Sequence, residues 1–455
     1  GKERLKAMIE TRPDWCVSRQ RVWGVPLPIF VHKKTKEILA DDWVNENIAS
    51  IYEKEGSDCW FSDDPQKFLG DKYKAEDYEK ISDIVEVWFD SGSTHSFVLE
   101  KRKDLKWPAS MYLEGSDQHR GWFHSSLLES CGTRGRAPFE SILSHGFVVD
   151  GKGLKMSKSV GNVIAPEDIL KKYGADILRI WVASSNYAED LRIDYSILDQ
   201  HADSYRKIRN TFRYLLGNIS DNLEKIDLEK IDIKKLPELE QYMLHKIYSL
   251  DLNFKKYFKN YDFHNLYKEL LNFCTVDLSA FYFDIRKDCL YCDTKDSFKR
   301  QSTILLLKII LNALLKWFAP VLSFTTEEIF KLVGNKKSIH LEEFIKFPIN
   351  FKNDNLNLKW QELIKIRDVC NLSIEEKRST KIIGSSLEAI LKIKLNKENF
   401  EIVKDIDLSE LCITSSAQVE KGEKNEILVE TEKAEGTKCS VCWKISTQPC
   451  LRHGS

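Results

Sequence analysis

Two lysines and two serines gather in the short stretch GLKMSKSVGN, residues 153–162. Lys155 and Lys158 supply ammonium groups, Ser157 and Ser159 supply hydroxyls, and a glycine stands at each end of the run. Mobile ammonium groups suit a reaction that builds negative charge on phosphates, because they can close over that charge as it develops. The alternative is a solvated surface turn, which is what most short Lys/Ser runs are.

A second group of polar residues follows an apolar run. MYLEG, residues 111–115, predicts a strand, and HRGWFHSSLLES after it predicts a helix. Carboxylates at the end of a strand can accept hydrogen bonds from a ribose diol or an α-ammonium group, and a glycine allows close approach to the backbone. A polar loop without a ligand is the other reading. The residues concerned are Glu114, Gly115, Asp117 and Gln118.

A third group lies near the end of the sequence, where Cys439, Cys442, Cys450 and His453 have the paired spacing of zinc ligands. Three thiolates and one imidazole would close a tetrahedral shell, so the expected zinc is structural and not catalytic. The alternative is a set of reduced, metal-free cysteines. Cys289 and Cys292 repeat the C-x2-C spacing without a second pair nearby, and we interpret them as structural.

Composition restricts the class of protein that carries these groups. The chain has 455 residues, is 42% hydrophobic and 31% charged, and has a net charge of −1, so any surface for nucleic acid must be local. Its eleven cysteines are odd in number and irregularly spaced, which argues against a disulfide framework. We therefore expect a reducing, cytoplasmic setting.

The most apolar segment is ILLLKIILNALLKWFAP, residues 304–320. Lys308, Asn312 and Lys316 recur every fourth residue and place one polar stripe along an otherwise apolar helix. This pattern is typical of a buried bundle helix that ends at Pro320, not of a membrane span. We expect no membrane partner.

Patterning along the chain predicts three kinds of architecture. Residues 1–195 alternate strand-like and helix-like runs, with a tight turn at Asp150-Gly151, and indicate an α/β domain. Residues 196–350 repeat apolar positions every three or four residues and indicate a helical bundle, in which Thr325 and Glu328 would form a capping box. Residues 351–437 contain a helix around 360–369 and strands at 389–395 and 426–431, and 438–455 form the zinc-binding tail.

Five stretches, taken together and in this order, resemble bacterial-type isoleucyl-tRNA synthetase, a class I aminoacyl-tRNA synthetase. The resemblance covers the chain from residue 1 to the terminal cysteines, and GSDQHRGWF separates it from valyl-tRNA synthetase. The family usually has four cysteines and a longer spacer at the zinc site, so His453 is a departure from it. The stretches are RPDWCVSRQRVWGVPLP (12–28), VWFDSG (87–92), EGSDQHRGWFHSSL (114–127), GLKMSKSVGN (153–162) and KYGADILRIWVA (172–183).

The resemblance implies roles for the first two groups of residues. ATP would be the substrate, together with Mg²⁺. Lys155 and Lys158 would act on its departing pyrophosphate, and Lys158 would contact ATP directly. Glu114, Gly115, Asp117 and Gln118 would hold the aminoacyl-adenylate. Trp88 and Trp122 would wall an apolar slot for the isoleucine side chain, although both could be plain core residues. His119 and His145 are open between adenylate contacts and structural histidines.

The resemblance also implies the fold and the partners. Residues 1–195 would be the second half of a class I nucleotide-binding (Rossmann-type) catalytic domain, followed by an all-α anticodon-binding bundle and a small α+β C-terminal region with the zinc site. The expected partners are tRNA(Ile), isoleucine and ATP. Exposed cations that could meet phosphates, or simply face solvent, are Arg206, Arg209, Arg213, Lys377 and Arg378.

The His-x-Gly-His signature that class I enzymes use for ATP does not occur in the sequence, and neither does an editing domain. We therefore expect the C-terminal portion of a longer isoleucine–tRNA ligase, inactive by itself in amino-acid activation. A non-catalytic tRNA-binding protein derived from a synthetase is the alternative from another class, and another branched-chain synthetase is a weaker one. The intact KMSKS and EGSDQH segments argue against a pure binder.

Overall fold

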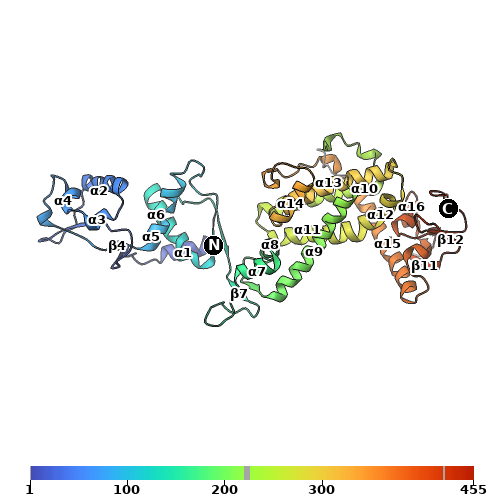
Figure 1. Ribbon diagram of the computed structural model, residues 1–455, viewed down its shortest axis with the longest axis horizontal. Helices are drawn as coiled ribbons and strands as arrows, with labels where there is room; N and C mark the ends of the chain where they lie inside the picture. The colour runs from blue at the N-terminus through green and yellow to red at the C-terminus, as the bar shows by residue number, and fades with distance from the viewer. Residues whose placement is uncertain (1, 220–225, 424–425, 455) are drawn as a thin grey trace. The chain divides into compact units, whose positions relative to one another are not determined.

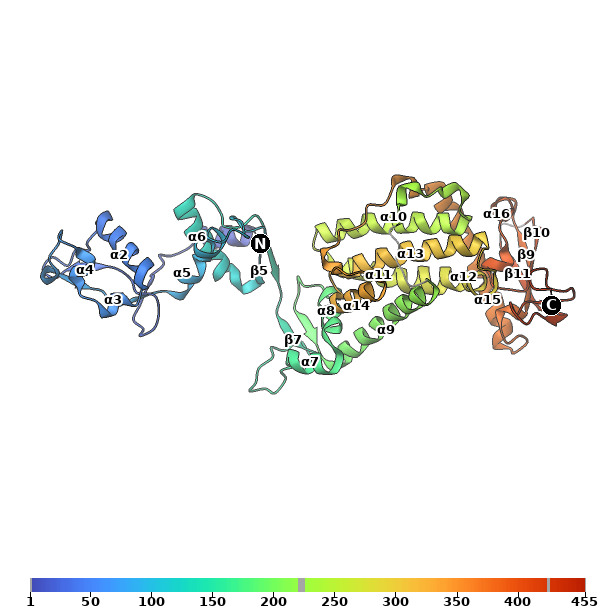
Figure 2. The ribbon, with the colours of Figure 1, turned by 45° about the horizontal axis from the view of Figure 1, so that its top comes forward.

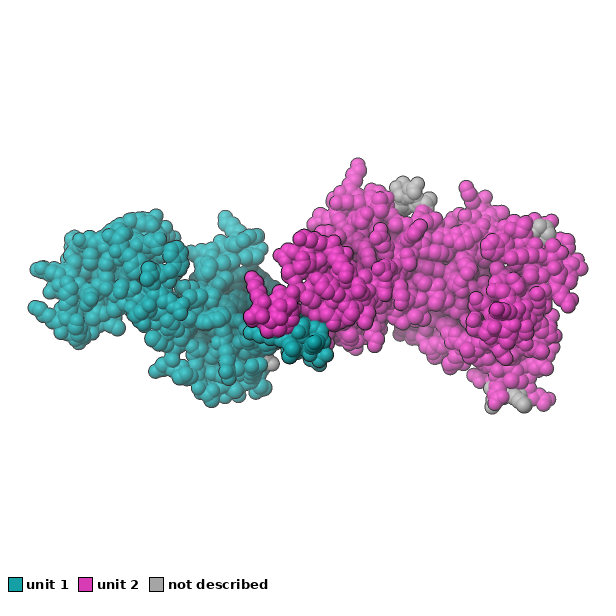
Figure 3. Space-filling view, turned by 60° about the horizontal axis from the view of Figure 1, so that its bottom comes forward, with its two compact units in different colours: residues 1–155, 187–192 teal, residues 156–186, 193–455 magenta. Residues whose placement is uncertain are grey.

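The computed structural model describes residues 2–219, 226–423 and 426–454. The chain forms two compact units (Figure 3). Unit 1 comprises residues 1–155 and 187–192, and unit 2 comprises residues 156–186 and 193–455.

The first part of unit 1 is a small helical subdomain on a strand pair. β2 (Phe30–His32) pairs antiparallel with β3 (Tyr78–Lys80), and α2 (Asp42–Glu55), α3 (Cys59–Ser62) and α4 (Pro65–Leu69) lie between them in the chain. Asp41 starts α2 by accepting a hydrogen bond from the Val44 amide, which satisfies a first-turn donor. Its core consists of Phe30, Val44, Ile48, Cys59, Trp60, Phe68 and Leu69.

The second part of unit 1 contains the predicted strand and helix. β5 (Tyr112–Gly115) leads through the turn η3 (Ser116–His119) into α6 (Trp122–Arg134), so both predicted elements are confirmed. β5 pairs in parallel with β6 (Ile142–His145), and α6 contacts α5 (Val87–Gly92). The remaining elements are α1 (Lys2–Glu10), the antiparallel pair β1 (Ser18–Arg19) and β4 (Ile84–Val85), and the π-turn segment η2 (His95–Leu99).

The β5–β6 pair is unusual for a parallel sheet. Among the described residues β5 has only β6 as a neighbour, and the Leu113 side chain on β5 is 55% exposed. Parallel strands are normally covered on both faces and joined by further strands. The outer edge of β5 therefore offers unpaired backbone groups and an apolar side chain to another strand.

The predicted tight turn follows β7 (Val148–Asp150) and is confirmed. The Gly153 amide donates to the Asp150 carbonyl, and the Asp150 amide donates to the Leu154 carbonyl. A bridge between Val149 and Lys155 closes the hairpin. β7 shares a two-stranded sheet with β8 (Leu191–Ile193).

Unit 2 contains the predicted helical bundle, which Figure 2 shows with its long helices side by side. α9 begins at Asp194, whose carboxylate accepts from the Ile197 amide, and the predicted periodic residues Leu198, Ile208, Phe212 and Leu215 are buried. The helices are α7 (Pro166–Tyr173), α8 (Ala175–Ser184), α9 (Tyr195–Asn218), α10 (Glu238–Lys259), α11 (Phe263–Asn272), the π-helical η6 (Phe273–Tyr282), α12 (Phe283–Cys292), α13 (Phe298–Phe318), α14 (Ser323–Leu332) and α15 (Asp354–Ser379).

The apolar segment at 304–320 is α13, and it lies inside the bundle. By length and composition this helix could cross a membrane, but 67% of its most apolar window is buried against the protein. Lys308, Asn312 and Lys316 keep partial exposure, as the predicted polar stripe requires. α13 is therefore a core helix of the bundle.

The predicted capping box is wrong. α14 begins at Ser323, so Thr325 lies inside the helix and is buried. Asp176 of α8 accepts hydrogen bonds from the Phe324 and Thr325 amides, at 3.3 and 2.8 Å, and from the Thr325 hydroxyl at 2.6 Å. A carboxylate far away in the sequence thus satisfies the first-turn donors that a local cap would otherwise take.

A small sheet follows the bundle (Figure 1). β9 (Ala389–Leu395) is central, with β10 (Ser416–Lys421) parallel and β11 (Leu428–Lys433) antiparallel to it. Alternate residues of β9 are buried and belong to the same core as the bundle helices. Helices α16 (Lys397–Val403) and α17 (Leu408–Leu411) and the pair β12 (Thr437–Lys438) and β13 (Ile445–Ser446) complete it. Short 3-10 turns are η1 (Ala75–Asp77), η4 (Leu228–Lys230), η5 (Ile233–Lys235), η7 (Ile339–Leu341), η8 (Ile349–Phe351) and η9 (Ser386–Glu388).

Candidate functional site

The carboxyl ends of β5 and β6 bring several predicted site residues together in unit 1. The parallel register places Glu114 opposite Ser144 and Gly115 opposite His145. A Cβ atom on Gly115 would lie 2.6 Å from the Asp117 Oδ1 atom and 3.9 Å from the His145 ring. Gly115 therefore allows the Asp117 carboxylate to approach the strand end closely, whereas the His145 ring would be in ordinary contact with a side chain there.

Gln118 connects this strand end to the start of α6. Its Oε1 atom accepts a hydrogen bond from the Trp122 amide at 2.9 Å, and its Nε2 atom donates to the Asp117 carboxylate at 3.1 Å. The amide side chain thus caps a helix and orients Asp117 at the same time. Glu114 and Asp117 are exposed and remain available to a ligand.

Gly121 lies against the predicted pocket residue Trp88 and directly precedes the other one, Trp122, in the chain. A Cβ atom on Gly121 would lie 3.1 Å from the Trp88 ring and 2.5 Å from the Gln118 Oε1 atom. Trp122 stacks on Tyr112 with ring centroids 4.2 Å apart and donates from its indole to the Ser91 carbonyl at 2.8 Å. Trp88 is 43% exposed. Trp122 is therefore fixed by packing, whereas Trp88 offers an open aromatic face.

The histidines near this strand end are held by backbone carbonyls. His145 Nδ1 lies 2.7 Å from the Gly146 carbonyl, and His119 Nδ1 lies 2.8 Å from the Ser116 carbonyl. A carbonyl only accepts, so Nδ1 carries the proton in both rings. His119 is buried, and its Nε2 atom has no hydrogen-bond partner within the described residues.

The sequence analysis missed a buried acid beneath α5. Both carboxylate oxygens of Glu129 are buried without a hydrogen-bond partner among the described residues, and a Cβ atom on Gly92 would lie 2.3 Å from the Oε1 atom. Burial, followed by the nearby Asp90, raises the pKa of Glu129 to about 8. Burial also raises the pKa of Asp90 itself, with Glu86 as a further cause. No local pattern signalled Glu129, because its burial arises from the packing of α5 on α6.

The lysine and serine stretch forms a compact turn. Asn162 accepts a hydrogen bond from the Ser157 amide at 2.9 Å, and the Ser157 and Ser159 hydroxyls lie 3.1 Å apart. Gly153 and Gly161 both have left-handed backbone angles, with φ of 84° and 73°. Lys155 is exposed at the end of the unit 1 hairpin, and Lys158 is exposed in unit 2.

The cations named for phosphate contacts lie on α9 and α15. Arg206 pairs with Asp203 and Arg378 with Glu375, in both cases on the same helix. Arg209 and Arg213 are exposed, and Lys377 is half-buried. This placement suits a phosphate contact and a solvated helix face equally.

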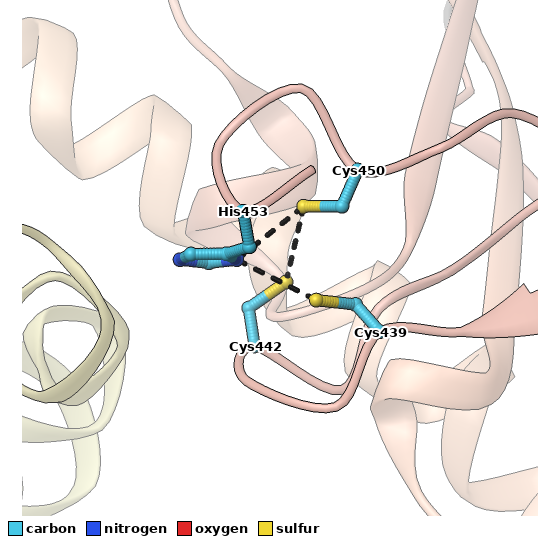
Figure 4. Close-up of side chains that lie close together, drawn as sticks. All are labelled: Cys439, Cys442, Cys450 and His453. Atoms are coloured by element: carbon cyan, nitrogen blue, oxygen red, sulfur yellow. Dashed lines mark hydrogen bonds between the residues drawn. The ribbon is translucent and has the colours of Figure 1, made fainter. Parts of the chain in front are cut away.

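The four predicted metal ligands meet in one cluster (Figure 4). The three sulfur atoms and the ligating nitrogen of His453 all lie within 4.8 Å of one another, so the cluster could hold a metal ion. His453 Nδ1 lies 3.5 Å from the Cys439 sulfur and 3.4 Å from that of Cys450, and the Cys442 and Cys450 sulfurs are 3.8 Å apart. Three sulfur donors and one imidazole nitrogen fit a borderline-soft, tetrahedral cation.

A contact beyond the cluster supports this fit. His453 Nε2 lies 3.0 Å from the Cys292 carbonyl at the end of α12. The carbonyl requires a proton on Nε2, which leaves the Nδ1 lone pair directed at the sulfurs, as a metal-binding imidazole needs. Arg452 pairs with Asp288 and Asp293 beside it. Cys292, interpreted as structural from the sequence, therefore contributes through its backbone.

The comparisons with known proteins cover both units. Residues 1–194 match the family model "tRNA synthetases class I (I, L, M and V)", and residues 240–395 match "Anticodon-binding domain of tRNA ligase". The isoleucine--tRNA ligase of Pelagibacter ubique is 79% identical over 454 residues, which are 100% of this chain and 50% of that protein. The isoleucine--tRNA ligase of Caldicellulosiruptor saccharolyticus is 46% identical over 460 residues, which cover 98% of this chain and 50% of that protein.

Two solved structures share the fold. A complex of Agrobacterium radiobacter K84 agnB2 LeuRS with tRNA and LeuAMS has a TM-score of 0.56 at 15% identity, covering 94% of this chain and 46% of that one. Mycobacterium tuberculosis methionyl-tRNA synthetase in complex with methionyl-adenylate has a TM-score of 0.52 at 16% identity, and the match covers 73% of this chain and 57% of that one.

The chain spans about half the length of the curated relatives it matches. Within that span, the class I model matches the region that contains the β5–β6 pair, and the anticodon-binding model matches the region from α10 to β9. The chain belongs to the class I tRNA synthetases, in the family of the isoleucine--tRNA ligases.

Proposed function

We propose that this polypeptide provides the carboxyl-terminal half of the catalytic domain and the tRNA-binding part of an isoleucine--tRNA ligase. The reaction would activate isoleucine with ATP and Mg²⁺ to isoleucyl-adenylate and then transfer the isoleucyl group to tRNA(Ile). The observation that carries the proposal is the strand-end cluster, in which Glu114, Gly115 and His145 share one register and Gln118 orients Asp117.

Each group has a role in this proposal. Glu114 and Asp117 accept hydrogen bonds from the ribose and the α-ammonium group of the adenylate, and the open face of Trp88 contacts the isoleucine side chain. Trp122, which is held by its stacking on Tyr112, forms another wall of the slot for the isoleucine side chain. Lys155 and Lys158 neutralise the pyrophosphate as it leaves, which favours the transition state over the ground state.

We further propose the following division of the chain. Residues 1–195 belong to a Rossmann-type catalytic domain, 196–350 to the anticodon-binding bundle, 351–437 to a tRNA-contacting α+β region, and 438–455 to a zinc-binding tail. Cys439, Cys442, Cys450 and His453 would hold one structural Zn²⁺, whose contribution is to fix the fold of the tail. No disulfide joins any of the cysteines among the residues that the structure describes, which suits the cytoplasm.

The open edge of β5 supplies the physical reason for a complementation test. A parallel pair with an exposed Leu113 needs further strands before it can form a covered sheet. We expect no isoleucine-dependent ATP–pyrophosphate exchange from this chain alone. Addition of a purified polypeptide covering the other half of the Pelagibacter ubique relative should restore exchange.

The choice of amino acid and the Lys158→Ala variant make this test specific. Isoleucine, valine, leucine and methionine are compared as substrates, and only isoleucine should support full exchange. The Lys158→Ala variant should fold and complement but exchange at least about 100-fold more slowly, as expected for the loss of one transition-state contact. tRNA binding without exchange in any combination would instead favour the non-catalytic tRNA-binding protein.

A further inference from the structure

The contact between α5 and α6 in unit 1 contains a buried acid that the proposed reaction does not use. Trp122, Ser125 and Glu129 recur at helical spacing and therefore share one face of α6. On α5, a Cβ atom on Gly92 would lie 3.0 Å from the Ser125 Oγ atom and 2.3 Å from the Glu129 Oε1 atom. The two helices therefore approach closely at Gly92, and the Glu129 carboxyl group lies inside that contact.

Both walls of the proposed isoleucine slot are attached to the same two helices. Trp88 lies in the first turn of α5, and a Cβ atom on Gly121, directly before α6, would lie 3.1 Å from its ring. Trp122 begins α6, and its indole donates to the Ser91 carbonyl of α5 at 2.8 Å. A change in the distance between α5 and α6 would therefore change the distance between the two indole rings.

The Glu129 carboxyl group has no partner in this contact. Both of its oxygens are buried without a hydrogen bond among the described residues. Burial without a partner costs much more free energy for a carboxylate than for a neutral carboxyl group. The contact therefore accommodates the protonated form, in agreement with the pKa of about 8 to which burial and, second, Asp90 raise this group.

The groups that face Glu129 from α5 and β5 do not stabilise a negative charge on it. Asp90 on α5 is itself an acid, and burial raises its pKa, with Glu86 as a further cause. Burial and, less strongly, Glu129 raise the pKa of the Tyr112 phenol on β5. Arg19 pairs with Glu86, at 3.9 Å, and not with Glu129.

The basic side chains beside this contact are also engaged elsewhere. His95 of η2 reaches the Gly92 carbonyl through Nδ1 at 3.0 Å, and burial lowers the pKa of this imidazole, so the ring is neutral. Arg134, in the last turn of α6, pairs with Glu100. An ionised Glu129 would therefore lie in the contact without a compensating charge among the described residues.

We propose that Glu129 is a positioning residue for the isoleucine slot: its neutral form lets α5 and α6 pack closely and fixes the spacing of Trp88 and Trp122, and its ionised form loosens that contact. Glu129 acts only through the two tryptophans and does not touch the substrate. Loss of its proton to solvent as the pH rises would draw water to the carboxylate, and the contact at Gly92 would open. The inference rests on the proposed function, because that proposal assigns the slot to isoleucine.

The first measurement uses the full chain by itself. Hydrogen exchange with mass spectrometry follows the peptides that cover α5 at about pH 7 and about pH 9, after correction for the intrinsic change of exchange rate with pH. The wild type should lose protection of α5 at the higher pH, whereas Glu129→Gln, which does not ionise, should keep it. The matched control is Glu140→Gln, which removes an exposed acid of unit 1 that pairs with Lys106 at 3.3 Å, and it should behave as the wild type. If Glu129→Gln does not fold, Glu129→Met replaces it, because methionine is unbranched and adapts to irregular packing.

The second measurement is ATP–pyrophosphate exchange after addition of the other half of the Pelagibacter ubique relative, with the KM for isoleucine determined at the same two pH values. With a pKa of about 8, the neutral fraction of Glu129 falls from about 0.9 to about 0.1 over this range, and the apparent affinity falls in proportion. The KM of the wild type should therefore rise by up to about ninefold more than that of Glu129→Gln, since titration of isoleucine itself affects both proteins equally. The kcat should change equally in both, because bound isoleucine holds the slot closed.

Parallel KM profiles of the wild type and Glu129→Gln would overturn the inference and leave the proposed function standing. Equal protection of α5 at both pH values in the wild type would also overturn it. A pH effect that differs between the two proteins only in kcat would do the same, because the spacing of the slot acts on isoleucine binding. If no combination shows exchange, the proposed function is refuted, and with it the slot that Glu129 is inferred to position.

Discussion

A buried ion pair between α10 and α12 provides a strict test of how these two helices are held together. Arg286 on α12 donates to both carboxylate oxygens of Glu240 on α10, at 2.7 and 2.6 Å. Both side chains are fully buried or nearly so. Tyr282 and Thr303 add hydroxyl donors to Glu240 at 3.0 and 3.2 Å, and Arg286 continues to Glu410 at 2.8 Å.

We predict that Arg286→Met destabilises the bundle by about 3–5 kcal/mol, because it leaves the Glu240 carboxylate buried with only two hydroxyl donors. Glu240→Gln should also destabilise, since it leaves the guanidinium with half of its bidentate partner. In the double variant neither charge remains unpaired. Its cost should therefore be smaller than the sum of the two single costs by about 2–3 kcal/mol.

The assay is native-state hydrogen exchange with mass spectrometry on the full chain, read as the opening free energy of peptides from α10 and α12. The matched control is Arg378→Met, which breaks the exposed i,i+3 pair with Glu375 and should cost less than about 1 kcal/mol. Strict additivity of Glu240→Gln and Arg286→Met, or a cost below about 1 kcal/mol for Arg286→Met, would refute the reasoning.

Three further predictions concern other parts of the chain. Because the pKa of Glu129 is raised to about 8, the folded form binds a proton that the unfolded form has lost. As pH rises from about 4.5 to about 8, the usual and the raised pKa of this carboxyl, wild-type stability of unit 1 should fall by about 2 kcal/mol more than that of Glu129→Gln. This figure is already reduced because the carboxylate is only partly shielded from solvent. Parallel pH profiles of the two proteins in urea unfolding would contradict this prediction. Asp176→Ala should lower the stability of α14 by about 2–4 kcal/mol, because two amides and the Thr325 hydroxyl lose a charged acceptor. Hydrogen exchange of the α14 amides should become faster in this variant. Unchanged protection of α14 would show that water replaces the carboxylate. Cys450→Ser should reduce bound zinc from about one per chain and speed exchange in residues 437–454; full zinc retention would show that Cys450 is not a ligand.

Local patterns in the sequence predicted elements whose periodicity is strong. α9 carries apolar residues at helical spacing, and β9 alternates buried and exposed residues over its whole length. The metal cluster was also predictable, because paired short spacings bring Cys439 and Cys442, and Cys450 and His453, onto two adjacent turns.

Features that depend on distant partners were not predictable. The predicted capping box at Thr325 was wrong because Asp176, on the distant helix α8, accepts the hydrogen bonds of the first-turn amides of α14. Glu240 and Arg286 each look like surface residues of an amphipathic helix until α10 and α12 pack.

The ten-residue π-helix η6 has a consequence for changes of chain length. Its wide turns hold more residues than an α-helix of the same height, so removal of one residue would favour rewinding into regular α-helix. Each residue of an α-helix turns the chain by about 100°, and a deletion in η6 would rotate α12 by that amount about its axis. Arg286 would then leave the Glu240 carboxylate and the Cys292 carbonyl would leave His453. We expect the length of this segment to be fixed.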